Sequence, residues 1–229
     1  MRGTNCGVFG PPAFSYPATV EYAVMSSRCG PRLVGLAGGS CSGKSTLARA
    51  LADAADGVVL PQDAYYRDLS ELTPNARQRW NFDSPAAFDW DRFTTDLARL
   101  ADGAAVHTPV YDYTNHTRAD RTRLVTPRSL VVVEGLLVFH DERTRALFDL
   151  TVFLDVHKDT ALARRVARDR EERGRDATEV RERFARDTQP MFKRWVVPTR
   201  RWAMLQLSGP LPVAELVASV RERLAQSSE

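Results

Sequence analysis

Residues 38–46 of the chain read Gly-Gly-Ser-Cys-Ser-Gly-Lys-Ser-Thr and match the phosphate-binding pattern G-x-x-x-x-G-K-[ST]. The apolar run 32–37 before this stretch is typical of a buried strand, and residues 46–53 after it have helical spacing. Glycines allow the tight turn that points successive backbone N–H groups at a phosphate, and the helix N-terminus adds its positive dipole end. The stretch therefore predicts a P-loop that binds a nucleoside triphosphate.

Each residue of this loop is expected to contact the bound nucleotide. The loop consists of Gly38, Gly39, Ser40, Cys41, Ser42, Gly43, Lys44, Ser45 and Thr46. A lysine at this place reaches the β- and γ-phosphates, and the serine that follows it ligates Mg²⁺ through its hydroxyl. We therefore predict ATP or GTP and Mg²⁺ as cofactors, with Lys44 as a catalytic residue and Ser45 as a metal ligand.

Length and composition are those of a soluble globular protein. The chain has 229 residues, of which 43% are hydrophobic and 27% charged, enough for one domain with a sizeable core. No apolar run approaches the roughly 20 residues that a membrane span needs. A net charge of +3 is too small to indicate nucleic acid, so neither a membrane nor a nucleic acid is an expected partner. The cysteines Cys6, Cys29 and Cys41 do not suggest a disulfide framework, which favours the reducing cytoplasm.

The N-terminal part of the chain differs in composition from the rest. Residues 1–30 are rich in Gly, Pro and Ser and show neither sustained periodicity nor a secretory pattern. We interpret them as a disordered extension, with Met25 as a candidate for the true translation start. Residues 31–229 are predicted to form a single domain around the phosphate-binding loop.

Strand-like and helix-like segments alternate along this domain. Near-continuous apolar runs at 129–134 and 149–155 are typical of parallel strands buried on both faces, and 57–63 is a shorter strand. Helical patterns occupy 91–101, 160–173, 178–192 and 212–225, and the arms 105–113 and 117–126 predict an antiparallel hairpin. Residues 64–88 are interpreted as loop and short helical turns. This order predicts an α/β fold, a three-layer P-loop NTPase with a parallel sheet, a β-hairpin arm and an arginine-rich helical lid.

Two carboxylates follow predicted strands at the edge of the sheet where ligands bind. Glu134 ends an apolar strand, where P-loop folds place a second acidic group near Mg²⁺. Asp63 ends the strand that follows the P-loop helix, so we expect it to face the phosphates as a general base for an acceptor hydroxyl. The local sequence is equally consistent with Asp63 as the N-cap of a short helix at 64–66.

Arginines are concentrated in one predicted helical segment. They are Arg164, Arg165, Arg168, Arg170, Arg173 and Arg175. Positions 165, 168, 172 and 175 share a helical face, so three of these arginines are expected to converge on triphosphate oxygens. Acidic residues between them leave open a solvated, salt-bridged surface instead.

These blocks together resemble the uridine kinases (uridine–cytidine kinases). The resemblance runs from about Arg32 to Ala203. It rests on residues 38–46, 62–68, 81–89, 109–118, 133–137, 164–169, 173–175, 189–192 and 197–200. The P-loop is widespread, whereas Asn-Phe-Asp at 81–83 and Tyr-Asp-Tyr-x-x-His-x-Arg at 111–118 are far more specific. The resemblance implies a P-loop kinase domain over 31–229 that assembles as a homotetramer.

The resemblance also implies roles for single residues. Asp63 would be the base for the nucleoside 5′-hydroxyl, and Asp83 would bind the ribose hydroxyls. Tyr111 and His116 on the hairpin would hold the pyrimidine. From the lid, Arg165 and Arg175 would serve the substrate and Arg168 the triphosphate.

The chain departs from the family in the acceptor pocket. Arg183 stands where the family usually has Gln, so we expect it to contact the substrate and to favour an acceptor with negative charge. Ser84 and Ala86 replace the common His and Asp. Residues 202–209 lack the Asp and the Ile-Ile strand of the family's Tyr-Ala-Asp-Ile-Ile-Pro-x-Gly. These departures concern substrate identity more than reaction type.

The predicted reaction is transfer of the γ-phosphate of ATP or GTP to the 5′-hydroxyl of uridine or cytidine. One alternative is a related kinase for another small hydroxyl acceptor, such as nicotinamide riboside, a sugar phosphate or pantothenate. A second is a nucleotide-binding regulator without catalysis, although Lys44, Ser45, Asp63 and Glu134 argue against it. A nucleic-acid binder is a weaker third interpretation.

Overall fold

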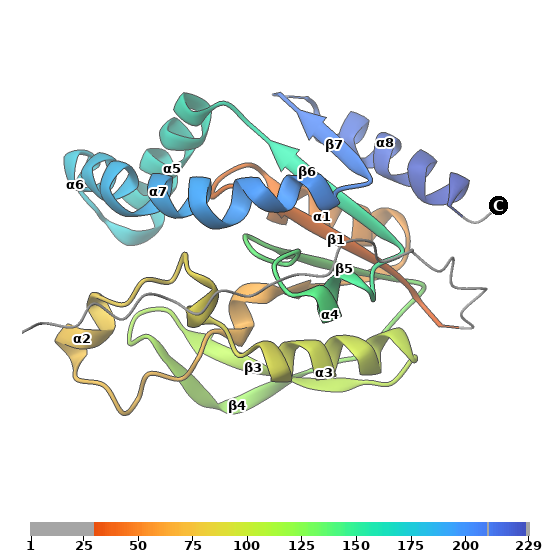
Figure 1. Cartoon of the computed structure of the whole chain (residues 1–229), viewed down its shortest axis with the longest axis horizontal. Coiled ribbons are helices and arrows are strands. Elements are labelled where there is room, and N and C mark those ends of the chain that lie inside the picture. Colours follow the sequence, from red (N-terminus) through yellow and green to blue (C-terminus); the bar gives the residue numbers. More distant parts are fainter. Residues whose placement is uncertain (1–29, 210, 228–229) are drawn as a thin grey trace, which may run out of the picture.

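A parallel sheet of five strands forms the centre of the domain in the computed structural model (Figure 1), which describes residues 30–209 and 211–227. The predicted extension and its Met25 lie outside the described residues, Gly30 apart. The strand order is β2-β5-β1-β6-β7. The strands are β1 (Arg32–Gly38), β2 (Gly57–Pro61), β5 (Leu130–Gly135), β6 (Leu150–Asp155) and β7 (Leu205–Ser208). All neighbouring strands in it run parallel, as the apolar runs predict.

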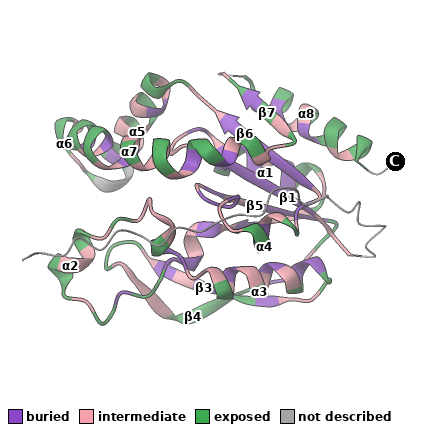
Figure 2. Cartoon of the chain, viewed as in Figure 1, coloured by how far each residue is buried: buried purple, intermediate pink, exposed green. Residues whose placement is uncertain are grey.

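Helices cover both faces of this sheet and give the three layers that the sequence predicts. On one face, α1 (Lys44–Ala54) and α8 (Val213–Gln226) bury leucines and valines against β1 and β6. On the other face, α3 (Trp90–Ala101) and a group of phenylalanines close the second core. Figure 2 shows the strands as the most buried layer, with exposed residues on the outer faces of α5, α6 and β4. The expected fold class is confirmed.

The predicted hairpin is present beside α3. Its strands are β3 (Val106–Asp112) and β4 (Thr117–Val125), which pair antiparallel. The Asp112 carboxylate accepts hydrogen bonds from the backbone N–H groups of Thr114 and Asn115, at 2.8 and 3.1 Å. Those bonds close the turn between the two strands and leave His116 at its end with a positive φ of 56°.

The lid begins with α5 (Lys158–Arg173), which ends at Gly174 in the left-handed region, φ 61°. Next come α6 (Ala177–Arg183), capped by the Asp176 carboxylate, and then π-helical turns on either side of α7 (Gln189–Met191). A 3₁₀ segment, Val197–Trp202, completes the path, so the helical region extends well beyond the predicted end at 192. Pro190 and Pro198 lie in this path, and proline lacks the N–H that regular α-helical bonding needs.

The remaining helices are short. They are the 3₁₀ turns η1 (Gln62–Tyr65) and η2 (Pro85–Ala87) and the helices α2 (Pro74–Gln78) and α4 (Glu142–Arg145). Three of the four lie within or border the segment 64–88, in which the sequence predicts loops and short turns. The strand predicted at 57–63 ends two residues earlier, at Pro61, because η1 begins at Gln62.

The expectation that the C-terminal strand is lost was wrong. Residues 205–208 form β7, which pairs with β6 at the edge of the sheet. The side chain of Leu207 is buried and Leu205 packs against the same core as α8. An edge strand needs only one apolar face, so alternating leucines suffice where the family has two isoleucines.

Candidate active site

The phosphate-binding loop lies between β1 and α1, as the motif predicts. Gly43 and Cys41 have positive φ angles of 102° and 60°, and the Ser42 N–H donates to the Gly39 carbonyl at 3.2 Å. At Gly38, a Cβ would lie 2.3 Å from the Leu154 carbonyl oxygen, so a larger residue has no room there. The loop thus has the tight turn that lets backbone N–H groups surround a phosphate.

Lys44 lies buried in this loop, with 7% of its surface exposed. Its Nζ donates a hydrogen bond to the Gly39 carbonyl at 2.7 Å. Burial lowers the pKa of the ammonium, whereas the charges of Glu134 and Asp63 act in the opposite direction. The lysine therefore stands between the loop and the two predicted carboxylates.

Ser45 and Glu134 meet across the sheet edge. The Ser45 hydroxyl donates to Glu134 Oε1 at 3.0 Å. Mg²⁺ prefers oxygen ligands and commonly takes one or two protein groups, completing its shell with substrate phosphates and water. The described residues contain no cluster of three or more His, Cys, Asp or Glu side chains able to hold a metal ion. This oxygen pair therefore fits Mg²⁺ that arrives with the nucleotide.

Asp63 lies inside η1, where Pro61 rather than Asp63 occupies the N-cap position. The alternative role of Asp63 as a helix N-cap is therefore wrong. Burial, followed by the negative charge of Glu134, raises the pKa of Asp63 to about 6, although Lys44 and a hydrogen bond with Tyr66 oppose the shift. A carboxylate with this pKa is ionised at neutral pH and remains basic enough to accept a proton from a hydroxyl.

The raised pKa of Asp63 predicts the pH dependence of the reaction. The acid limb of kcat/KM is expected to have its midpoint near the pKa of about 6, since protonated Asp63 cannot accept the hydroxyl proton. Below this midpoint kcat/KM should fall about tenfold per pH unit. A profile that stays flat from neutral pH to about one unit below the midpoint would contradict the role of Asp63 as the base.

Asp83 reaches the same region from the loop before η2. Burial raises its pKa, while the positive charge of Arg165 and a hydrogen bond with Thr188 oppose the shift. Arg165 in turn lies 3.4 Å from the Ser40 hydroxyl through its Nη1. Asp83, to which the resemblance assigns the ribose hydroxyls, therefore lies near both the lid and the phosphate-binding loop.

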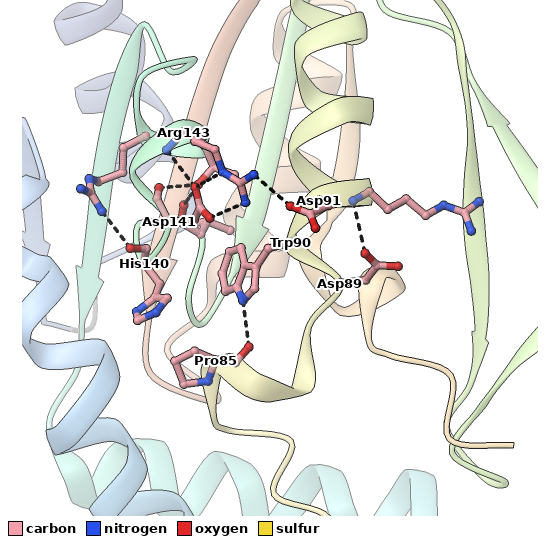
Figure 3. A network of polar contacts seen from close by, with 11 residues as sticks. Pro85, Asp89, Trp90, Asp91, His140, Asp141 and Arg143 are labelled. Atoms are coloured by element: carbon pink, nitrogen blue, oxygen red, sulfur yellow. Dashed lines mark hydrogen bonds and ion pairs between the residues drawn. The ribbon is translucent and has the colours of Figure 1, made fainter. Parts of the chain in front are cut away.

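A polar network anchors the segment that follows Asp83 (Figure 3). The Trp90 indole N–H donates to the Pro85 carbonyl at 2.8 Å, and Asp89 caps the first turn of α3. Arg143 forms ion pairs of 2.9 Å with both Asp91 and Asp141, which ties α4 to α3. These contacts hold the loop of Asp83 on the rigid part of the domain.

Aromatic rings cluster where the hairpin meets the segment of Phe82. Tyr111 is 7% exposed, and its buried hydroxyl has no hydrogen-bond partner among the described residues. The His116 imidazole stacks on Phe82, with ring centroids 4.7 Å apart and an interplanar angle of 25°. Burial, then the charges of Arg183 and Arg175, lower the pKa of His116, so the imidazole is neutral at pH 7. The predicted pair Tyr111 and His116 thus lies in one aromatic cluster, in which both rings contact Phe82.

The hairpin is fixed to the rest of the site by Arg118. Its side chain donates to the Tyr66 carbonyl at 3.0 Å and forms a 3.0 Å ion pair with Asp89. The Tyr66 ring packs against Tyr111, with centroids 5.3 Å apart, and the Tyr66 hydroxyl is hydrogen-bonded to Asp63. One arginine thus couples the hairpin to the turn that carries Asp63.

The lid arginines were expected to converge on triphosphate oxygens, and in the structure they converge on the carboxylate of Asp169. Arg165, Arg168 and Arg175 form ion pairs with Asp169 at 3.9, 2.8 and 3.4 Å. Asp169 is 1% exposed. The prediction that residue 175 continues the helical face was wrong, because α5 ends at Arg173 and the chain turns at Gly174. Since the three guanidiniums are already gathered by Asp169, they lie close enough together to act on one substrate.

Replacing this carboxylate is expected to loosen the lid. Asp169→Asn removes the negative charge that three arginines share, so the free energy of unfolding should fall by about 3 kcal/mol, the lower end for a broken buried ion pair. Urea denaturation measures the change, with Asp159→Asn, an exposed residue of the same helix, as control. Equal stability of both variants would show that Asp169 does not organise the lid.

Arg183 lies at the end of α6 and pairs with Glu179 at 3.9 Å. Its positive charge contributes to the lowered pKa of His116. The pKa of Asp187 is lowered by its hydrogen bond with Arg186 and, to a smaller extent, by the charges of Arg183 and Arg165. Arg183 therefore lies close enough to the hairpin for its charge to act on His116, and Glu179 offsets part of that charge.

Several side chains of the site were not predicted from the sequence. They are Gln62, Tyr66, Phe82, Arg164 and Thr188. Arg164, for example, lies 3.4 Å from the carbonyl oxygens of Cys41 and Ser42 in the loop. Tyr66 and Phe82 belong to the blocks that carry the family resemblance, so their position beside Asp63 and Asp83 was the available signal.

The sequence matches a known family. The model of the phosphoribulokinase/uridine kinase family matches residues 33–208. The chain belongs to this family. The resemblance predicted from the sequence is thus confirmed, and with it the expectation of an enzyme, a phosphotransferase of the P-loop kinase type.

Individual relatives agree with this assignment. The chain is 39% identical over 178 residues to a uridine kinase of Leuconostoc citreum, covering 76% of this chain and 85% of that protein. It is also 39% identical to a uridine kinase of Streptococcus agalactiae serotype V, covering 82% and 90%. A solved structure from Silicibacter sp. TM1040, a candidate fructose transport system kinase, has a TM-score of 0.63 at 23% identity and covers 80% of this chain and 93% of its own. That likeness concerns the fold alone.

Proposed function

We propose that the protein transfers the γ-phosphate of ATP or GTP to the 5′-hydroxyl of uridine or cytidine, with Mg²⁺. The observation that carries the proposal is the meeting of Asp63, Lys44 and the Ser45–Glu134 pair at the phosphate-binding loop. A cluster of aromatic residues adjoins them through Tyr66 and offers a place for the acceptor. The relatives that share most of the chain are named uridine kinases, which supports the same acceptor.

In the proposed mechanism, the loop N–H groups and Lys44 bind the β- and γ-phosphates and stabilise the charge that develops on them. Ser45 and Glu134 would hold Mg²⁺, which neutralises charge on the phosphate oxygens when it is bound. Asp63 accepts the proton of the acceptor hydroxyl as the phosphoryl group is transferred. The lid arginines gathered at Asp169 neutralise negative charge from the opposite side.

The acceptor pocket supports a nucleoside. Asp83 offers carboxylate oxygens, which accept hydrogen bonds from two adjacent hydroxyls of a ribose. At the hairpin, the unpaired Tyr111 hydroxyl and the neutral His116 imidazole can each donate or accept a hydrogen bond. Such groups suit the edge of a pyrimidine, which presents both donors and acceptors.

The charge around Arg183 favours a neutral acceptor over an anionic one. The sequence predicts that this arginine attracts a negatively charged substrate. However, Glu179 lies 3.9 Å from Arg183 and offsets its charge. A sugar phosphate is therefore a weaker candidate than a nucleoside.

Compartment and assembly are part of the proposal. No helix of the described residues is long and apolar enough to cross a membrane. Cys41 carries a free thiol in the phosphate-binding loop, which suits the proposed cytoplasmic location. The homotetramer implied by the resemblance is proposed as well, and light scattering after size exclusion would measure it.

An ADP-release assay tests the proposed reaction. The enzyme is given Mg²⁺ with ATP or GTP and, in separate reactions, uridine, cytidine, nicotinamide riboside, pantothenate or ribulose 5-phosphate. Turnover confined to uridine and cytidine is the expected result. Turnover of another acceptor would replace the pyrimidine assignment, and nucleotide binding without any turnover would favour the regulatory alternative.

A further inference from the structure

The ends of β2 and β5 lie side by side and carry the two carboxylates of the site. In their register Pro61 is paired with Glu134. The next residues along each strand are Gln62 and Gly135, and Asp63 follows Gln62 directly. A side chain that connects these two strand ends therefore controls how far the base lies from the metal ligand.

Gln62 makes this connection from a fully buried position, with 0% of its surface exposed. Its Oε1 accepts a hydrogen bond from the Leu137 backbone N–H at 2.9 Å. Because an N–H group needs an acceptor, this bond also determines the orientation of the amide. The amide thus binds the turn that leaves β5 after Glu134.

Gly135 has no side chain, and the Gln62 side chain occupies the space that one would fill. A Cβ on Gly135 would lie 2.5 Å from both Cβ and Oε1 of Gln62. The glutamine side chain is therefore pressed against the backbone directly after Glu134. Any shift of either strand end would have to move this contact.

The amide nitrogen of Gln62 has no evident structural role among the described residues. The Gln62 Nε2 is buried and has no hydrogen-bond partner. An apolar side chain would fill the same space without burying an unpaired donor, which costs free energy. A polar residue at this position thus points to a role for its oxygen in the turn after Glu134.

We propose that Gln62 is a positioning residue, which sets the distance between Asp63 and the Ser45–Glu134 pair by holding the turn after β5 against η1. The inference rests on the proposed function, in which Asp63 is the base and Ser45 and Glu134 hold the metal. A misplacement of about 1 Å in a reacting group can cost about 100-fold in rate. Gln62 itself touches neither phosphate nor acceptor in this role.

Two substitutions separate the oxygen of Gln62 from the bulk of its side chain. Gln62→Met keeps the length and removes the acceptor for the Leu137 N–H, whereas Gln62→Glu keeps an oxygen there. Gln206→Met, at an exposed position of β7, is the matched control. Mn²⁺ serves as the probe in the presence of ADP, and electron paramagnetic resonance measures its binding without any acceptor turnover.

Gln62→Met is expected to weaken Mn²⁺ binding by about tenfold and to lower kcat by about 10- to 100-fold, with KM for both substrates changed by less than about threefold. Gln62→Glu is expected to bind Mn²⁺ no more weakly than the native chain. If Gln62→Met does not fold, Gly135→Ala, whose methyl group displaces the same amide, replaces it.

The proposal is overturned if Gln62→Met loses only thermal stability and keeps native Mn²⁺ binding and kcat. Equal losses in Gln62→Met and the control Gln206→Met would also overturn it, because the loss would then not depend on the position of Gln62. A native chain that binds Mn²⁺ and ADP but phosphorylates no pyrimidine nucleoside would contradict the proposed function instead. The measurement of Mn²⁺ binding therefore distinguishes failure of the Gln62 proposal from failure of the proposed function.

Discussion

Asp63→Asn is expected to lower kcat by about 100-fold or more while binding of ATP changes little. Asp63 interacts with Tyr66, whose ring packs against Tyr111 of the proposed acceptor site, so this carboxylate lies on the side where the acceptor hydroxyl would bind. Asparagine keeps its shape but cannot accept a proton. The ADP-release assay with uridine measures kcat, and calorimetry measures ATP binding.

The same variant should be more stable than the native chain at neutral pH. Burial and Glu134 raise the pKa of Asp63 above its unfolded value, so ionising this carboxyl group lowers the free energy of unfolding. This cost is complete above the folded pKa of about 6 and disappears as the pH falls toward the unfolded pKa. The melting temperature of Asp63→Asn should therefore exceed the native value at pH 7, and the difference should shrink in acid.

Asp53→Asn, at an exposed position of α1, is the control for both measurements. It should leave kcat and the pH dependence of melting unchanged. A kcat for Asp63→Asn within about threefold of the native value would remove Asp63 from the role of base.

Lys44→Met is expected to lower kcat by about 100- to 1,000-fold, the usual effect of removing one preorganised donor to developing negative charge. Methionine fills a similar buried volume, but the phosphates lose their ammonium and the Gly39 carbonyl loses its donor. The charge of Lys44 also opposes the raised pKa of Asp63. Without that charge the acid limb of the residual activity should move above about pH 6.

Lys193→Met, at an exposed position of the lid, provides the matched control. Single-turnover kinetics across the pH range measure both the rate and the midpoint. If the midpoint stays in place while the rate falls, Lys44 acts on the phosphates alone and not on Asp63.

Most of the scaffold could be predicted because its signals are local. The ranges 32–37, 129–134 and 149–155 agree with β1, β5 and β6 within a residue or two at each end. These strands are buried on both faces, so their sequences are continuously apolar. The hairpin was also predicted from its two arms, whereas β7 was missed because this edge strand buries Leu207 and only partly covers Leu205.

The site was predictable where a motif constrains the chemistry. The motif and the strand end assigned Lys44, Ser45 and Glu134. In the structure Ser45 is hydrogen-bonded to Glu134, and Lys44 is hydrogen-bonded to the Gly39 carbonyl of the loop. Arg165, Arg168 and Arg175 were expected on one helical face. Arg175 instead returns through the left-handed Gly174, and the common partner Asp169 was interpreted only as part of a charged surface.

The phosphate-binding loop, the parallel sheet and the family could be predicted from the order of residues, because spacing and apolar runs act over a few neighbouring residues. The contacts between side chains at the sheet edge depend instead on how distant segments pack. Gln62 and Leu137 are 75 residues apart, and their hydrogen bond exists because β2 and β5 pair in one register. The raised pKa of Asp63 has the same origin, since burial and Glu134 reach it only after the chain has folded.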